Sequence, residues 1–132
     1  MSLDKKELEK KITAIINSLI YEKGYICSVD VLLRLGYLAQ KDYEDWRLGR
    51  VPYLEKVCKV NLKKLSLTNK IIRKFAKQRQ LKSSWTGYNQ WGTKNKRILM
   101  FSKSGDLNIE KLYATHFIDT ARINELKALK NN

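Results

Sequence analysis

The chain has few of the residues that break secondary structure: one proline and six glycines among 132 residues. An all-β sandwich needs many tight turns, and glycine and proline build most of them. Their scarcity argues against such a fold and favours helices with short connections. A chain of this length is a usual size for one hydrophobic core, so we expect a single domain over 1–132.

Cysteine, histidine and long apolar runs are also scarce. Cys27 and Cys58 lie 31 residues apart, and His116 is the one histidine. These residues lack the spacing of a zinc site, so we expect no metal, no cofactor and two buried, reduced thiols. No run of about 18 apolar residues occurs, which predicts that no helix spans a membrane. The stretch "MSLDKKELEKK" is charged from Asp4 on and is unlike a secretory signal or a transit peptide, so we expect a cytoplasmic protein.

Acidic residues are almost absent from the middle of the chain. Residues 47–103 hold 16 Lys or Arg and one acid, Glu55, whereas the remaining residues hold 11 basic and 12 acidic side chains. The whole excess of +14 therefore lies in this segment. Concentrated charge of one sign repels itself, and binding of a polyanion would explain why it is kept. The alternatives are a solvated basic surface, a smaller anionic ligand or an acidic protein partner.

Three helices are predicted in the first 50 residues, over 4–22, 28–36 and 40–49. Asp4 is a suitable N-cap for the first, and apolar residues recur along it at steps of three and four. The succession resembles a helix-turn-helix motif, but the third helix carries three carboxylates, which phosphates would repel. We therefore expect the nucleic-acid contacts to lie elsewhere.

The basic segment 52–80 is predicted to be one bent helix or two helices, because Pro52 suits a first helical position and Ser66 a second N-cap. Its cations recur every three or four residues, which places them on a common face opposite the apolar residues. The predicted phosphate-binding residues on this face are Lys56, Lys59, Lys63, Lys70, Arg73, Lys74 and Lys77.

A β-hairpin is predicted next, with strands "SWTGYNQW" and "RILMFSK" joined by "GTKNK". Lys94, Lys96 and Arg97 lie at its tip and would hold a nucleic-acid backbone, as the wing of a winged-helix protein does. We expect the aromatic residues Trp85 and Trp91 to be mostly hidden in the core, although exposed rings would stack on unpaired bases.

Beyond the hairpin, Asp106 or Asn108 is predicted to cap one helix and Asp119 a last one. Asp106 and Glu110 are four residues apart and share a helical face. In a metal-dependent phosphodiesterase or nuclease they would bind the cation, with Lys103 stabilising the transition state and His116 as a base. Capping and surface solvation explain Asp106 and Glu110 better, and packing explains His116 better, so we expect binding rather than catalysis.

The stretches "YEDWRLGRVPYLEKV", "SWTGYNQWG" and "LMFSKSGDLNIEKLYATHF" resemble a group of small bacterial proteins to which no activity is attached. The resemblance covers most of residues 40–118. It implies a self-contained bacterial, cytoplasmic domain and assigns no site residues.

The sequence thus predicts a mostly helical α+β fold: a helical bundle with one antiparallel β-hairpin, winged-helix-like at most. We expect a basic protein that binds DNA or RNA through the phosphate backbone with low sequence specificity. A phosphodiesterase-type enzyme and an adaptor for an acidic protein are the alternatives. The choice between DNA and RNA and the oligomeric state stay open.

Overall fold

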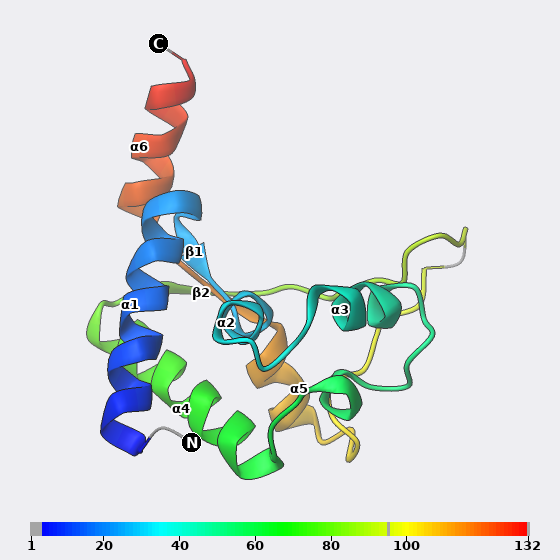
Figure 1. Cartoon of the computed structure of the whole chain (residues 1–132). Helices are drawn as coiled ribbons and strands as arrows, with labels where there is room; N and C mark the ends of the chain where they lie inside the picture. The colour runs from blue at the N-terminus through cyan, green and yellow to red at the C-terminus, as the bar shows by residue number, and fades with distance from the viewer. Residues whose placement is uncertain (1–3, 95, 132) are drawn as a thin grey trace.

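The structure is a computed structural model that describes residues 4–94 and 96–131 (Figure 1). Within these ranges helices dominate, and a small sheet joins segments from three parts of the chain. The predicted mostly helical α+β class is confirmed. The helices are α1 (Lys5–Lys23), α2 (Ser28–Leu35), α3 (Gln40–Arg47), the 3-10 helix η1 (Leu54–Val57), α4 (Leu62–Gln78), α5 (Leu107–Ala114) and α6 (Thr120–Lys130).

Several helices begin and end where the sequence predicts. The Asp4 carboxylate accepts a hydrogen bond from the backbone N–H of Glu7, and α1 ends at Gly24 in the left-handed conformation. Asp106 and Asp119 cap α5 and α6 in the same way as Asp4 caps α1. Gly36 ends α2, also with a positive φ.

The predicted helix start at residue 51 or 52 is wrong. Pro52 lies in an irregular segment, and α4 begins later, with the Asn61 side chain accepting from the backbone N–H of Lys64 at 2.9 Å. Ser66, the predicted second cap, lies inside α4. The delay has a tertiary cause, because the backbone N–H groups of Leu54 and Glu55 donate to carbonyls of residues 100 and 101. These long-range bonds hold η1 apart from α4.

The sheet has the strand order β1–β3–β2, with β1 at Tyr25–Ile26, β2 at Lys82–Trp85 and β3 at Thr115–Ile118. Both pairings are antiparallel, so β3 is the central strand and β2 lies at an edge. The start of the first predicted hairpin strand, Ser84 and Trp85, therefore pairs with β3 and not with its neighbour in sequence.

The predicted hairpin forms only in part. Its two arms meet in one isolated antiparallel bridge between Asn89 and Ile98, next to single backbone hydrogen bonds at residues 90 and 99. A regular two-stranded wing is absent from the described residues. The second arm contributes its backbone to the core instead, since the carbonyl of Met100 accepts both the Trp46 indole N–H at 2.8 Å and the Leu54 N–H at 3.1 Å.

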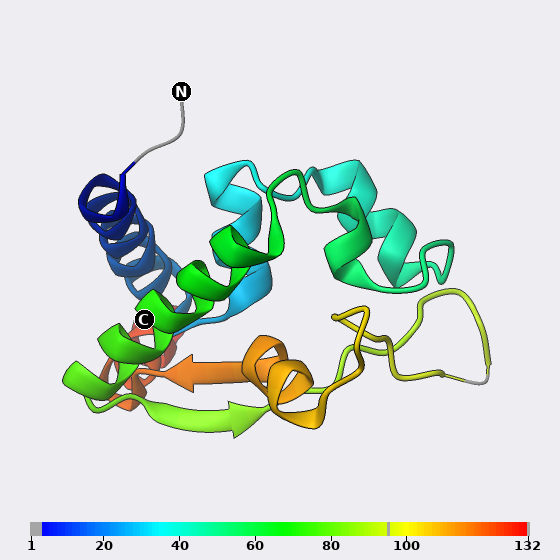
Figure 2. The same cartoon turned by 90° about the horizontal axis from the view of Figure 1, so that it is seen from below.

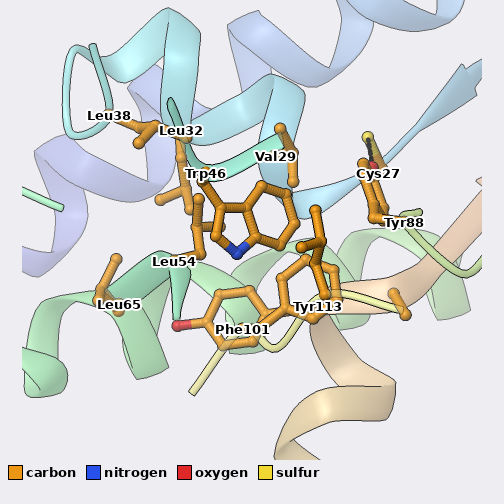
Figure 3. Close-up of a cluster of buried hydrophobic side chains, with 12 residues drawn as sticks. Cys27, Val29, Leu32, Leu38, Trp46, Leu54, Leu65, Tyr88, Phe101 and Tyr113 are labelled. Atoms are coloured by element: carbon orange, nitrogen blue, oxygen red, sulfur yellow. Dashed lines mark hydrogen bonds between the residues drawn. The ribbon is translucent and has the colours of Figure 1, made fainter. Parts of the chain in front are cut away.

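Two clusters of buried side chains form the interior. One joins α1, α2, α4 and Ile26 of β1. The other surrounds Trp46, which is fully buried and packs against Phe101 and Tyr88 (Figure 3). Phe101 in turn stacks on Tyr113 of α5. Trp46 is thus an anchor of the core, and this cluster fixes α5 relative to α3.

The last helix, α6, extends past the end of α1 in Figure 1. It is held at its first turn, where the Ile123 side chain lies against Gly24; a Cβ added at Gly24 would be 2.6 Å from Ile123 Cδ1. Arg122 also donates to the Tyr21 carbonyl. Leu129 near the end of α6 is 63% exposed, so the far end of this helix has no packing partner among the described residues.

Candidate nucleic-acid interface

Helix α4 has a buried side and a cationic side. Leu65, Ile72 and Phe75 are buried against the rest of the protein, and the opposite side carries exposed cations. The exposed cations nearest its C-terminal end are Lys70, Arg73, Lys74 and Lys77. The predicted separation of apolar and basic residues on this part of the helix is therefore observed.

These four cations line a groove of about 920 Å³. Figure 2 shows its setting: α4 runs beside strands β2 and β3, and α5 lies near the end of β2. Helix α5 adds Asn108 and Lys111, and the strands add Ser83, Thr115 and Phe117. The remaining lining residues are Ala76, Gln80, Leu81 and Leu112.

The groove combines a cationic rim with an apolar base. Five of its lining residues are cations, and none of the lining residues in the described part of the chain is acidic. Leu81, Leu112 and Phe117 are partly buried, whereas the cations are exposed. A phosphate placed here would meet positive charge from α4 and from Lys111 of α5.

One ion pair reaches the groove from the acidic N-terminal third. Lys74 Nζ lies 3.2 Å from Glu9 Oε1 of α1, and both groups are partly exposed, so the pair contributes at most about 1 kcal/mol. Within residues 4–94 and 96–131, Lys70, Arg73, Lys77 and Lys111 have no ion pair. The carboxylates of the N-terminal third therefore leave most of this charge unmasked.

The structure does not bring the other predicted cations into this groove. Lys63 lies one heptad before Lys70, so it continues the same helical face toward the start of α4. Lys56 lies in η1 and Lys59 in the following non-helical segment, and both are exposed. Lys56 and Lys59 therefore lie outside α4, and the seven cations of 56–77 do not form the single helical face that was predicted.

The loop that carries Lys94, Lys96 and Arg97 lies at the opposite end of the molecule from the C-terminal end of α4 in Figures 1 and 2. All three side chains are exposed. The loop and the groove are thus two separate basic surfaces.

The aromatic residues of the predicted hairpin differ from expectation. Tyr88 is buried, with 7% of its surface exposed, but Trp85 and Trp91 are 60% and 41% exposed. Trp91 is engaged nevertheless, because the Arg47 guanidinium lies 4.6 Å from its ring centre. The prediction that both tryptophans are mostly hidden is wrong, because Tyr88 is the aromatic residue of this segment that enters the core, which leaves Trp85 and Trp91 outside it.

The two carboxylates of the nuclease hypothesis have structural partners. Asp106 caps α5 by accepting from the backbone N–H groups of Asn108 and Ile109. Glu110 accepts from the backbone N–H groups of Phe101 and Ser102 at 2.9 and 2.7 Å. It also accepts from the Ser102 hydroxyl at 2.6 Å. Among the described residues, no group of three or more His, Cys, Asp or Glu side chains is placed to hold a metal ion.

His116 lies on β3, away from both carboxylates in the sequence and in a different element. Its ring stacks on Tyr25 with 5.3 Å between ring centres, and its Nε2 lies 3.1 Å from the Tyr88 hydroxyl. Burial lowers the pKa of His116, and the Asp30 carboxylate partly opposes this. Burial also raises the pKa of Tyr88, so the hydroxyl keeps its proton. The enzymatic and acidic-partner alternatives stay predictions.

Neither cysteine has the properties of a nucleophile. Both are free; Cys27 is buried and Cys58 partly buried. Burial raises the pKa of each thiol to about 12, which keeps both protonated and unreactive at neutral pH. The prediction of a buried apolar thiol holds for Cys27.

Two features of the groove and its surroundings could not be predicted from the sequence. Lys111 follows Glu110 in a segment where basic and acidic residues balance, so the neighbouring sequence gives no indication of a binding role for it. It reaches the groove because the Phe101–Tyr113 contact positions α5 and because β3 continues from it. The exposure of Trp85 likewise depends on a strand pairing that joins distant segments.

Comparisons of this chain with protein-family models, with curated proteins and with solved structures give no match. None of the helices in the described ranges is both long and apolar enough to cross a bilayer.

Proposed function

We propose that this protein binds nucleic acid through the groove between α4, α5 and the β2–β3 strands. Phosphates contact the four cations of α4 on one wall, including Lys74 once it leaves its exposed ion pair with Glu9, and Lys111 on the other. The observation that carries the proposal is the convergence of five cations from two helices on a groove whose lining, among the described residues, includes no acid. Release of counterions on binding makes such a site favourable for a polyanion.

Low sequence specificity follows from the same lining. Lysine and arginine side chains on the rim suit phosphates, which carry no sequence information. Gln80 and Asn108 are the amides that line the groove, and they are exposed at its margin. We therefore expect similar affinities for strands of different sequence and equal length.

The remaining predicted cations have a secondary role in this proposal. Lys56, Lys59 and Lys63 extend the basic surface past the start of α4. Lys94, Lys96 and Arg97 form a second contact that is reached only by a nucleic acid longer than the groove. Replacing these three loop residues by alanine should weaken binding of long strands and leave short ones unaffected.

The test uses a charge reversal in the groove and an equal one outside it. The Lys70→Glu/Arg73→Glu variant should bind a labelled oligonucleotide at least about tenfold more weakly, measured by fluorescence anisotropy. The matched control is Lys127→Glu/Lys130→Glu, because both lysines are exposed on α6 and line no part of the groove. Equal loss in the two variants would show that binding depends on net charge alone and would refute the groove.

A further inference from the structure

Trp85 is an exposed indole at the end of an edge strand. It shows 60% of its surface, whereas tryptophans are highly buried on average. An exposed ring at this position contributes little to the core.

The register of the strands places this ring beside the groove. Trp85 pairs with Thr115, and Ser83, two residues earlier, pairs with Phe117. Paired residues and residues two apart on a strand share one face of a sheet. Ser83, Thr115 and Phe117 all line the groove, so Trp85 lies on the same face, one pair farther toward α5.

A glycine leaves room for the indole. A Cβ added at Gly87 would lie 2.7 Å from Trp85 Cη2, so the ring occupies space that any other residue at 87 would fill. One part of the ring rests on the Gly87 backbone, while most of its surface stays open to solvent. The ring therefore has a defined orientation and still exposes a face, and both are needed for a base to stack on it.

We propose that the groove takes single-stranded nucleic acid, with an unpaired base stacked on Trp85 while the α4 cations and Lys111 hold its phosphates. This inference rests on the proposed function and adds the ligand class to it. A duplex keeps its base faces stacked inside, so an exposed indole and an apolar groove base offer it nothing. An unpaired strand presents both parts that the site would recognise, phosphates to the rim and bases to the apolar surface.

Unpaired DNA and unpaired RNA share this chemistry. The test therefore uses three labelled probes of about 12 nucleotides, a length within the range that such sites cover. They are a DNA strand, an RNA strand and a DNA duplex of the same sequence, each titrated at the same low salt. We expect at least one single strand to bind more tightly than the duplex. The strand that binds more tightly shows whether the site prefers unpaired DNA or unpaired RNA.

Trp85→Ala should weaken binding of the preferred single strand about 5- to 150-fold and leave duplex binding unchanged. Trp85→Phe should restore most of the affinity, because phenylalanine also offers a ring. Trp91→Ala is the matched control, since Trp91 is also exposed but lies against Arg47 and outside the strand whose face lines the groove. Strand binding should also quench the tryptophan fluorescence of the wild type, and this quenching should be smaller in Trp85→Phe.

The outcomes separate this inference from the proposed function. Equal affinity of Trp85→Ala and wild type for single strands, with binding still lost in Lys70→Glu/Arg73→Glu, would overturn the stacking role alone. Tighter binding of the duplex would overturn the ligand class alone. Failure of the wild type to bind any of the three probes would overturn the proposed function as well. Circular dichroism and thermal melting confirm the fold of each variant.

Discussion

The salt dependence of the binding affinity reports how many phosphates contact cations of the groove. Each cation that contacts a phosphate of a single strand adds about 0.7 to the steepness of log affinity against log salt. The groove has five cations, which predicts a slope of about −3.5. Replacing Lys70 and Arg73 by alanine removes two contacts and should reduce the slope to about −2.

The double alanine variant is a sound probe because it should fold at least as well as the wild type. Both side chains are exposed, and alanine is the strongest helix former. The substitutions also relieve repulsion, since Lys70 and Lys74 are four residues apart, as are Arg73 and Lys77. Each such like-charge pair costs about 0.2–0.5 kcal/mol in a helix.

The slope is measured by anisotropy titrations between about 50 and 200 mM salt. Lys127→Ala/Lys130→Ala serves as the control and should keep the slope of the wild type, although it loses the same charge. An unchanged slope in the Lys70→Ala/Arg73→Ala variant would refute the assignment of these residues to phosphate. A shallower slope in the control as well would show that the chain's overall charge governs binding.

Three further predictions follow from single contacts. Glu9→Gln removes the carboxylate that pairs with Lys74. The affinity for nucleic acid, measured by titration, should therefore rise about two- to fivefold. An unchanged affinity would contradict a contact between Lys74 and phosphate. Glu110→Gln leaves one backbone N–H of segment 101–102 without an acceptor. It should lower the free energy of unfolding, measured in urea, by about 1–3 kcal/mol. The control Glu125→Gln, at an exposed ion pair, should lower it by less than about 1 kcal/mol. Burial lowers the pKa of His116 in the folded protein, where Tyr88, Tyr25, Asp30 and Lys23 lie around it. As the pH falls, this histidine therefore binds a proton in the unfolded chain at a higher pH than in the folded protein. Stability should therefore fall as the pH drops below about 6.5 and level off below the folded pKa; a His116→Gln variant as pH-dependent as the wild type between about 7.5 and 5.5 would contradict this.

Local signals in the sequence predict most of the helices. Asp4, Asp106 and Asp119 cap helices where a carboxylate precedes a periodic apolar run, because a cap acts within three residues of itself. The errors lie where distant segments compete for the same backbone groups. Residues 52–61 have a helical pattern, yet the carbonyls of residues 100 and 101 take two of their N–H groups and leave only the short η1.

The strands show the same limit. β1 has two residues and β2 and β3 four each, which is too short for an alternating pattern to stand out. Their pairing brings together residues near 25, 82 and 117, so no short window of sequence contains it. The groove depends on that pairing. Helical spacing predicts one wall of it, and the sheet that supplies the other lining residues appears only in the folded chain.

The acidic residues beyond residue 50 explain why, in the described part of the chain, the groove cations other than Lys74 have no ion pair. Glu55 accepts from the Tyr113 hydroxyl at 2.9 Å, Asp106 and Asp119 cap helices, and Glu110 accepts from segment 101–102. These carboxylates accept hydrogen bonds from backbone or hydroxyl donors that would otherwise be unpaired. One further acid, Glu125, lies beyond residue 50 in the described part of the chain, and it pairs with Arg122. The fold therefore uses its acids for structure and leaves a row of like charges on α4 that lowers stability through repulsion. A bound polyanion removes that repulsion, so the cations that cost stability in the free protein contribute to affinity in the complex.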